Sequence, residues 1–288
     1  GKHLTNFLKD NKHSVYSFGN KKYSIQKKNL FYYNKNNFKK IINQYKPDSI
    51  FFLSGNSYPN NSKNETDDIN SNNLHLQQLL QSLVETHYKK LFFYTSSTSI
   101  YGSLKNKKNI HKDYKFNPQS FYSLSKLFAE QQIKYYSDNF NINSVILRLS
   151  SIYGQGLKRQ VIFKILKNSR TKKLIHLVGW PNDSRQFLYI NDLVLIIYKL
   201  INKKILKGFN LFNITNQNST KINQIIKIVE KIRGKKINVK YDKKNESPKI
   251  LKLSNLKIKK FIRFNKFTSL SLGSVSYTHL TLPTKRIV

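Results

Sequence analysis

Apolar runs of strand length alternate with amphipathic stretches of helix length along the first half of the chain. Runs typical of buried strands cover residues 14–18, 47–55, 90–96 and 143–151. Between them, apolar positions recur every three or four residues, which predicts helices over residues 2–10, 37–45, 69–88 and 118–140. Strands that alternate with helices form parallel sheets with right-handed crossovers. The pattern therefore predicts an α/β fold with a doubly wound, Rossmann-like parallel sheet.

The alternation is less regular beyond residue 152. Helices are predicted over residues 157–169, 191–203 and 219–234, and short strands over residues 173–179, 186–190 and 209–215. Ser219 or Thr220 is the expected N-cap of the last of these helices. We interpret residues 1–152 as a sheet domain and residues 153–273 mainly as a smaller lobe, from which about residues 185–216 return to the sheet.

The two ends of the chain depart from an ordinary reading frame. Residues 274–288 begin "SVSYTHLTLPT", which lacks the Asn and Lys that fill the preceding sequence and resembles a sequencing adapter translated in frame. We therefore expect this tail to be non-native. The chain contains no methionine, so we also expect that Gly1 is not the natural start.

The formal net charge is +38, which raises the question of a polyanionic partner. Only seven of the 52 basic residues are Arg, and the lysines are scattered beside abundant Asn, Ile, Tyr and Phe, all of which have AT-rich codons. A protein that reads nucleic acid more often concentrates Arg on one element. We therefore attribute most of the charge to solvated Lys faces and expect no nucleic-acid partner.

Cysteine usage and hydropathy limit the classes of protein to which the chain can belong. The chain has no Cys, which excludes disulfides and thiolate metal sites and favours a reducing cytoplasm; no metal site is predicted. The longest apolar runs have about six residues against the ~20 of a membrane span, so no membrane association is expected.

Tyr122 and Lys126 lie four residues apart on the predicted helix over residues 118–140, which places them on one face. An ammonium group beside a phenol lowers its pKa from about 10, so that Tyr can act as a general acid or base. The same spacing occurs twice more in the chain and is not specific alone. This pair, however, opens a helix that follows the strand ending in "TSSTSIYG", residues 95–102.

Six short motifs occur in order along the chain: "YKPDSIFFLSG", "TSSTSIYG", "NPQSFYSLSK", "LRLSSIYGQG", "SRQFLYINDLV" and "FNITN". With them the chain resembles the extended short-chain dehydrogenases/reductases, in the branch of the NAD-dependent nucleotide-sugar epimerases and dehydratases. The resemblance implies NAD or NADP as cofactor, a nucleotide-sugar substrate and a homodimer. It also implies that residues 1–152 bind the cofactor and that the smaller lobe binds the substrate.

The resemblance implies three catalytic residues. Tyr122 is the acid/base, Lys126 lowers its pKa and holds the nicotinamide ribose, and Ser97 holds the substrate oxygen that is oxidised or reduced. A simpler interpretation of Ser97 is that it only ends a strand. Asp192 also matches a family position, but as a residue near a helix N-terminus we interpret it as structural.

The cofactor site implied by the resemblance departs from the family pattern. Its residues would be Gly1, Gly19, Asn20, Lys21, Leu53, Ser54, Gly55, Asn70 and Lys126, although Asn70 could equally be a helix cap. Gly1 matches the last glycine of the phosphate loop, so the first strand and most of that loop are absent, and we expect the chain as given to fold poorly and bind no cofactor. Gly19 stands where an acidic residue would hold the ribose of NAD, and Lys21 and Lys22 follow it. This favours tolerance of NADP or preference for it.

The substrate residues implied by the resemblance are Thr98, Ser99, Ser151, Lys158, Arg159 and Arg185. Arg185 would contact the diphosphate, although it could also be a surface ion-pair residue, and Lys158 and Arg159 could simply be solvated. Similar 4,6-dehydratases carry a carboxylate where this chain has Thr98 and Ser99. We therefore predict a 4-epimerase or keto-sugar reductase. The alternatives are a 4,6-dehydratase or a non-catalytic nucleotide- or RNA-binding protein on the same fold.

Overall fold

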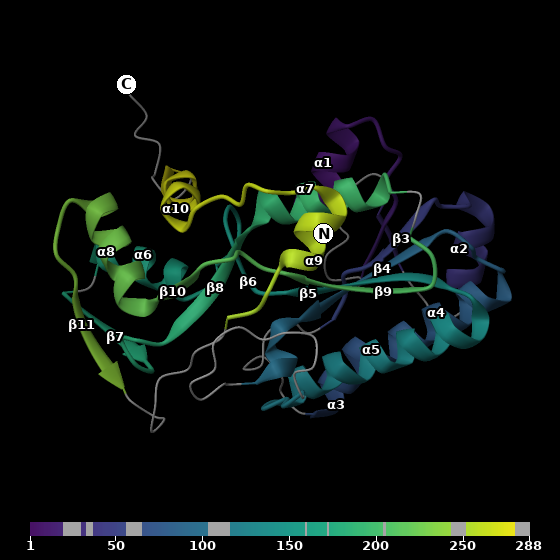
Figure 1. Cartoon of the computed structure of the whole chain (residues 1–288), viewed down its shortest axis with the longest axis horizontal. Helices are drawn as coiled ribbons and strands as arrows, with labels where there is room; N and C mark the ends of the chain where they lie inside the picture. Colours follow the sequence, from purple (N-terminus) through teal and green to yellow (C-terminus); the bar gives the residue numbers. More distant parts are fainter. Residues whose placement is uncertain are drawn as a thin grey trace. The chain divides into compact units, whose positions relative to one another are not determined.

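The computed structural model describes residues 1–19, 30–32, 37–55, 65–102, 116–158, 160–171, 173–203, 206–242 and 252–279. The chain forms two compact units (Figure 1). Unit 1 contains Gly1–Gly102, Phe116–Arg148 and Ile196–Phe212, and unit 2 contains Ser103–Lys115, Leu149–Leu195 and Asn213–Val288.

A four-stranded sheet forms the centre of unit 1. Its strands follow the order β3 (Ser49–Phe52), β4 (Leu91–Ser97), β5 (Asn143–Leu149) and β9 (Phe209–Ile214). Strands β3 and β4 are parallel, with Phe52 opposite Tyr94. A separate parallel pair consists of β1 (Ser17–Gly19) and β2 (Leu30–Tyr32). This mostly parallel sheet with flanking helices confirms the predicted α/β class.

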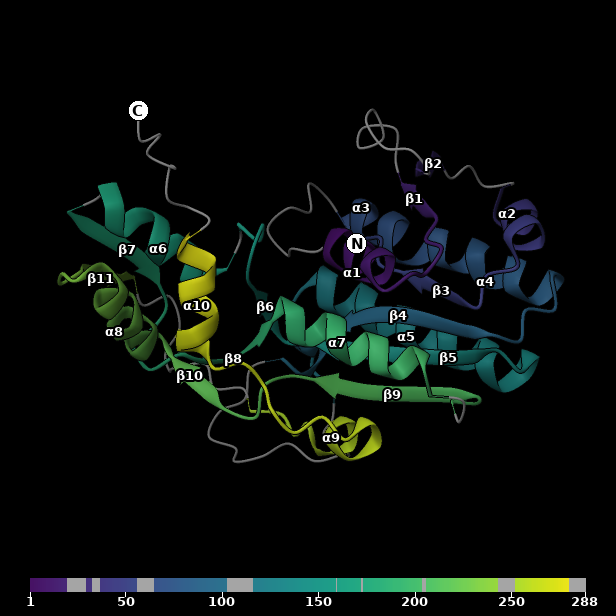
Figure 2. The same ribbon diagram turned by 90° about the horizontal axis from the view of Figure 1, so that it is seen from above.

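Helices cover both faces of this sheet (Figures 1 and 2). One face carries α4 (His75–Glu85) and α5 (Phe121–Phe140), preceded by α3 (Glu65–Ile69) and the π-helix η3 (Asn70–Leu74), while α2 (Asn37–Tyr45) packs against α4. The other face carries α1 (Lys2–Asp10) and α7 (Ile190–Ile201), whose rings Phe7 and Tyr198 meet edge to face at 5.4 Å. The core between sheet and helices contains Leu76, Leu80, Leu83, Phe92, Ala129, Ile133 and Ile146.

The start of α5 is fixed by two serines. Ser120 is the N-cap, and its Oγ accepts a hydrogen bond from the Ser123 backbone N–H at 3.2 Å. In return, Ser123 Oγ accepts from the Ser120 N–H at 3.0 Å, which completes a reciprocal capping box. The helix ends at Asn141, which has a left-handed backbone. Tyr122 therefore lies in the first turn of α5.

Unit 2 contains two small sheets and four helices among its described residues. In one sheet, β8 (Ser184–Tyr189) pairs parallel with β6 (Ser151–Tyr153) and antiparallel with β10 (Ser219–Lys221). In the other, β7 (Leu174–Val178) and β11 (Asn238–Asp242) are parallel. The helices are α6 (Val161–Thr171), α8 (Ile222–Arg233), α9 (Leu256–Ile262) and α10 (Leu270–His279). Helix α10 continues through residue 274, and the non-native origin of the tail stays a prediction.

The predicted cap of α8 is wrong. Ser219 and Thr220 form strand β10 opposite Gln186 and Arg185, and the helix begins after Lys221. The Lys221 N–H donates to Gln224 Oε1 at 2.9 Å, so the cap bond comes from inside the helix. A three-residue strand has too short an alternation to be recognised, whereas Ser and Thr before an amphipathic stretch are typical N-caps.

The hydropathy of the helices bears on one further class of protein, those that span a membrane. Among the helices within the described ranges, none is long and apolar enough for a membrane crossing.

The short 3₁₀ helix η4 (Thr98–Tyr101) after β4 ends at a glycine that no other residue replaces easily. Gly102 has φ +67° and ψ −160°, a region that side chains rarely adopt. A Cβ atom there would lie 2.2 Å from the carbonyl oxygen of Asn117, whose N–H donates to Ile100 O at 2.9 Å. The turn and the segment before α5 therefore pack backbone against backbone.

We expect Gly102→Ala to lower the free energy of unfolding by about 3 kcal/mol or more, because the strained backbone costs about 1–3 kcal/mol and the clash adds to it. The matched control is Gly234→Ala, since Gly234 has φ +66° but no neighbouring atom within 4 Å of the place that a Cβ would take. That variant should lose only about 1–2 kcal/mol. Chemical denaturation measures both, and equal losses would contradict the argument.

Candidate active site

Strand β4 leads from the core of unit 1 to a row of hydroxyl groups. Phe92, Phe93 and Tyr94 are fully buried, and Ser97 ends the strand with extended backbone. Ser97 Oγ accepts a hydrogen bond from the Ser99 N–H at 3.1 Å. In open α/β sheets, ligands bind at the carboxyl ends of the strands. The end of β4, which lies between β3 and β5, is therefore the expected place for a site.

The structure brings Ser97 and Tyr122 together. The Ser97 hydroxyl at the end of β4 lies close enough to the Tyr122 hydroxyl in the first turn of α5 to lower the pKa of Tyr122. Burial raises the pKa of Tyr122, the hydrogen bond from Ser97 lowers it, and the charge of Asp68 raises it. The net pKa lies above the usual value, so the predicted lowering by Lys126 is wrong for the protein by itself. Desolvation of the phenolate outweighs the favourable contacts.

Lys126 lies one turn after Tyr122 and is buried. Its ammonium group donates to the Thr95 carbonyl at 3.2 Å and lies 4.8 Å from the ring centroid of Tyr94 and 6.0 Å from that of Tyr122. Burial lowers the pKa of Lys126 to about 8, while the carboxylates of Glu130 and Asp68 oppose this effect. The ammonium is therefore charged at neutral pH, but by a narrow margin.

The asparagines of η3 differ in burial. Asn70 is exposed, whereas Asn72 and Asn73 are buried and donate to Ser125 on α5, to its Oγ and its carbonyl oxygen respectively, each at 3.0 Å. The Oδ1 atoms of both asparagines have no hydrogen-bond partner among the described residues. Asn72 therefore contacts α5, the helix that carries Tyr122 and Lys126, whereas the role of Asn70 stays a prediction.

The sequence held a signal for these residues. Asn72 shares the spacing of the buried residues Leu76, Leu79, Leu80 and Leu83, whereas Asn70 does not. Asp68, which is fully buried and acts on the charges of Tyr122 and Lys126, was missed. It precedes a π-helical turn, and such turns often occur at functional sites.

Several predicted cofactor residues lie at element ends. Gly1 is the N-cap of α1, and its carbonyl accepts from the Thr5 N–H at 2.9 Å. The first turn of α1 has no acidic residue, so its N-terminus suits an anion. Gly19 ends β1. Leu53, Ser54 and Gly55 follow β3 next to the end of β4, and Gly55 has φ +126°. Asn20, Lys21 and Lys22 lie outside the described residues.

The predicted substrate residues lie in both units. Thr98 is buried in η4, and Ser99 Oγ is buried without a hydrogen-bond partner in the part of the chain described. In unit 2, Ser151 begins β6, while Lys158 and Arg185 are exposed. Arg159 lies outside the described residues.

Asp192 has a structural environment in unit 2. Its two carboxylate oxygens accept hydrogen bonds from the backbone N–H and the Oγ1 of Thr268, each at 2.7 Å. These bonds attach the C-terminal segment to the start of α7, which agrees with the structural interpretation. Within the described ranges, no group of three or more His, Cys, Asp or Glu side chains could hold a metal ion.

The family model of the NAD dependent epimerase/dehydratase family matches residues 1–215. The chain belongs to this family. One relative of this chain is the uncharacterized UDP-glucose epimerase YtcB of Bacillus subtilis. The two are 28% identical over 200 residues, which are 69% of this chain and 62% of the relative. The chain thus spans about three fifths of the length of that relative.

Two solved structures share the epimerase-family fold. UDP-glucuronic acid 4-epimerase from Bacillus cereus, in complex with UDP-glucuronic acid and NAD, has a TM-score of 0.84 at 23% identity and covers 98% of this chain and 95% of that one. UDP-glucose 4-epimerase from Thermotoga maritima, with UDP-glucose, has a TM-score of 0.86 at 18% identity and covers 98% and 94%. At these identities the likeness shows the fold alone.

We expect Ser97→Ala to raise the pKa of Tyr122 further, because the variant removes the hydrogen bond that lowers it. The absorbance of tyrosinate is titrated in the protein and in the same protein carrying Tyr122→Phe. The difference between the two curves is the titration of Tyr122. Ser82→Ala is the control, since Ser82 Oγ donates within α4, to the Gln78 carbonyl. If the Tyr122 titration is the same in Ser97→Ala as in the parent protein, Ser97 does not lower the pKa of Tyr122.

Proposed function

We propose that the protein made from the complete gene transfers hydride between a nicotinamide cofactor and a carbinol or ketone carbon of a nucleotide sugar, as a 4-epimerase or a keto-sugar reductase. The observation that carries the proposal is that the hydroxyl groups of Ser97 and Tyr122 are neighbours beside the buried ammonium group of Lys126. A phenol and a hydroxyl at the end of a central strand can hold one substrate oxygen between them. Membership of an NAD-dependent family supports the choice of cofactor.

The residues divide the chemistry between them. Ser97 holds the substrate oxygen, and Tyr122 removes its proton while the carbon loses hydride. Bound NAD would accept that hydride and, as a cation in its oxidised form, favour the Tyr122 phenolate. Lys126 keeps a positive charge beside the phenol. In an epimerase the keto sugar turns and Tyr122 returns the proton, whereas a reductase needs only the second half of the cycle.

Residues of unit 1 suit a dinucleotide. The N-terminus of α1 at Gly1 would hold the pyrophosphate, and the glycine turn after β3 leaves room for close approach of the cofactor. Lys126 uses one N–H on the Thr95 carbonyl and retains two for the nicotinamide ribose. Lys21 and Lys22 support tolerance of NADP.

The substrate class rests on the hydroxyl row and on Arg185. Thr98 and Ser99 cannot supply the carboxylate that a 4,6-dehydratase needs, which supports epimerisation or reduction. Arg185 is exposed on β8 and would bind the diphosphate through two parallel hydrogen bonds. The proteins of similar fold named above bind UDP-glucose or UDP-glucuronic acid. These are the first substrates to test.

The test uses protein made from the complete gene, incubated with a panel of UDP- and dTDP-sugars and with NAD or NADP. NMR of the products detects inversion at C4 or reduction of a keto sugar. We expect Tyr122→Phe to lower kcat about 10²- to 10⁴-fold, the usual contribution of an acid/base residue. Tyr135→Phe on the exposed side of the same helix is the control and should retain full activity. Near-normal turnover by Tyr122→Phe would contradict this mechanism.

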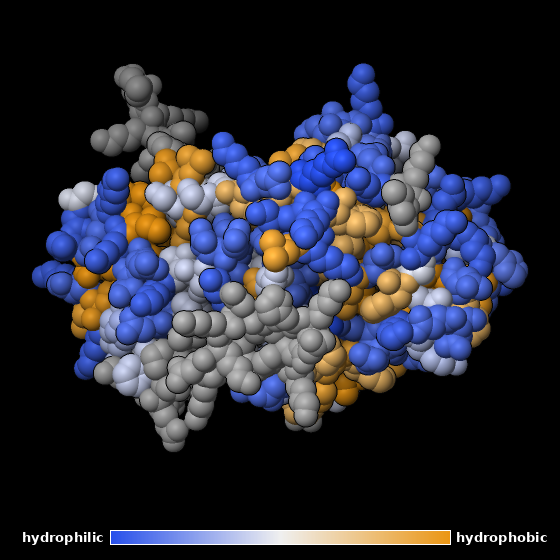
Figure 3. All heavy atoms as spheres, viewed as in Figure 1, coloured by the Kyte–Doolittle hydropathy of each residue, from blue (hydrophilic) through white to orange (hydrophobic). Residues whose placement is uncertain are grey.

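We also infer a homodimer that forms through α5. This helix exposes an apolar stripe of Phe121, Leu124, Phe128 and Tyr135, at 43, 49, 54 and 59% exposure. Their spacing keeps them on one side of the helix, and such a continuous patch is uncommon on a monomer. In the face shown in Figure 3, hydrophilic side chains predominate and apolar ones show along the lower edge, where Figure 1 places α5.

Phe128→Lys should therefore convert the dimer to a monomer at micromolar concentration, because it places a charge in the centre of the stripe. Val178→Lys is the control, as Val178 is 63% exposed on β7, outside the stripe. Sedimentation equilibrium measures the mass of each. A monomeric parent protein would contradict the inference.

A further inference from the structure

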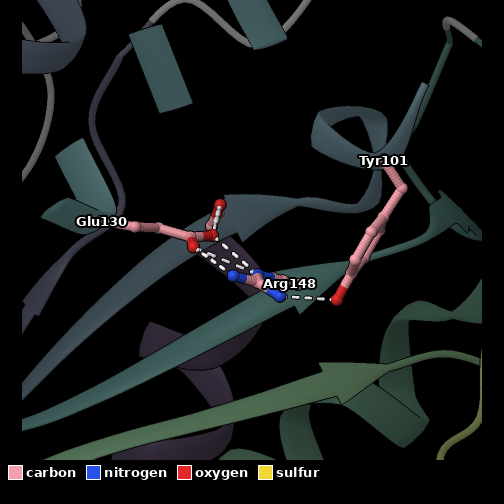
Figure 4. A network of polar contacts seen from close by, with 4 residues as sticks. Tyr101, Glu130 and Arg148 are labelled. Atoms are coloured by element: carbon pink, nitrogen blue, oxygen red, sulfur yellow. Dashed lines mark hydrogen bonds and ion pairs between the residues drawn. The ribbon is translucent and has the colours of Figure 1, made fainter. Parts of the chain in front are cut away.

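A buried carboxylate lies one turn beyond Lys126 on α5. Glu130 is 1% exposed and accepts a hydrogen bond from Ser96 Oγ (Figure 4). Arg148 on β5 donates to both carboxylate oxygens of Glu130, from Nε at 3.0 and 3.1 Å and from Nη2 at 2.6 Å. Every oxygen of the carboxylate is therefore held.

The second arm of Arg148 reaches the turn after β4. Nη1 donates to the hydroxyl of Tyr101, and the guanidinium lies 5.1 Å from the ring centroid of Tyr101 and 4.8 Å from that of Phe116. Burial lowers the pKa of Arg148, but the hydrogen bonds and charge of Glu130, with Tyr101, outweigh it and the net pKa is raised. The network thus joins β4, η4, α5 and β5, all within unit 1.

Stability alone is a poor reason for such a network. Replacing a buried ion pair by well-packed neutral residues is often neutral or stabilising, because desolvating two charges offsets their attraction. The position of this pair is more informative. Ser96 precedes the catalytic Ser97, and Glu130 follows Lys126 by one helical turn.

The charges around Lys126 come from four elements. Tyr122 and Glu130 lie on its own helix, Asp68 comes from α3, and β4 contributes the Tyr94 ring and the Thr95 carbonyl. Glu130 is in turn ion-paired with the Arg148 cation of β5. Burial lowers the pKa of Lys126 to about 8 even with the carboxylates of Glu130 and Asp68 opposing it. Loss of either carboxylate would therefore lower the pKa of Lys126 further.

We propose that Glu130, held in place by Arg148, is a positioning residue that supplies a fixed negative charge one helical turn from Lys126 and fixes the end of β4 beside Ser97. Its catalytic meaning rests on the proposed function. The effect on Lys126 itself does not, because that is a property of unit 1 without substrate.

The variant that tests this is Glu130→Gln combined with Arg148→Met. The single change Glu130→Gln leaves a guanidinium buried without its partner and could prevent folding. The double change removes both charges, while the introduced amide can still accept from Ser96 and the introduced thioether fills the volume of the arginine stem. Ser137→Ala is the matched control, since it breaks a buried Oγ–Oγ hydrogen bond of 2.6 Å with Ser144 between the same elements, α5 and β5, without changing a charge.

The measurement is an NMR titration of protein labelled at lysine ¹³Cε, with the Lys126 signal identified by its loss in Lys126→Arg. We expect the midpoint of Lys126 to be about one pH unit lower in the double variant than in Arg148→Met alone, because these two proteins differ only in the charge of residue 130 and a neighbouring opposite charge favours the charged form by about that much or more. In Ser137→Ala it should not move. The alkaline limit of turnover should fall by the same amount as the Lys126 midpoint.

The outcomes separate the two proposals. Equal Lys126 midpoints in the folded double variant and in Arg148→Met overturn the role of Glu130, whatever the activity of the parent protein. A lowered midpoint supports that role, even if the parent turns over no nucleotide sugar, in which case only the proposed function fails. A fall of the same size in Ser137→Ala also overturns the role, because it would reflect loosened packing.

Discussion

The ammonium group of Lys126 lies inside unit 1 at 5% exposure, and a buried charge must be paired or hydrogen-bonded. Much of the surrounding arrangement follows from this requirement. The Thr95 carbonyl and the Tyr94 ring supply contacts from β4, and Asp68 and Glu130 supply negative charge. Glu130 then needs a partner of its own, which is Arg148.

The helix that carries Lys126 has two different faces. Tyr122, Lys126 and Glu130 follow one another at four-residue intervals and face the end of the sheet, whereas the exposed stripe around Phe128 faces away from it. The capping box at Ser120 sets the phase of both faces, because it fixes where the helix begins. The proposed chemistry and the proposed dimer contact therefore use opposite sides of one helix.

The sequence predicts the alternating elements of unit 1 well, since each buried strand is a continuous apolar run and each helix has a clear apolar side. The structure places Ser97 and Tyr122, both named from the sequence, near each other at the end of β4, while their catalytic roles stay predictions. The direction of the Tyr122 pKa shift was not predictable, because it depends on how much water the fold excludes. Asp68 was missed for the same reason, as no local pattern distinguishes a buried carboxylate from a solvated one.

The serine cap of α5 has an electrostatic consequence for the tyrosine beside it. Many helices carry Asp or Glu in their first turn, where a carboxylate neutralises the positive end of the helix dipole. Helix α5 has no acidic residue there, and its cap is made by two neutral hydroxyl groups. The dipole therefore remains uncompensated at Tyr122, where it favours negative charge. Because the cap is Ser and not Asp, the partial positive charge at the N-terminus of α5 favours the phenolate in addition to the Lys126 ammonium.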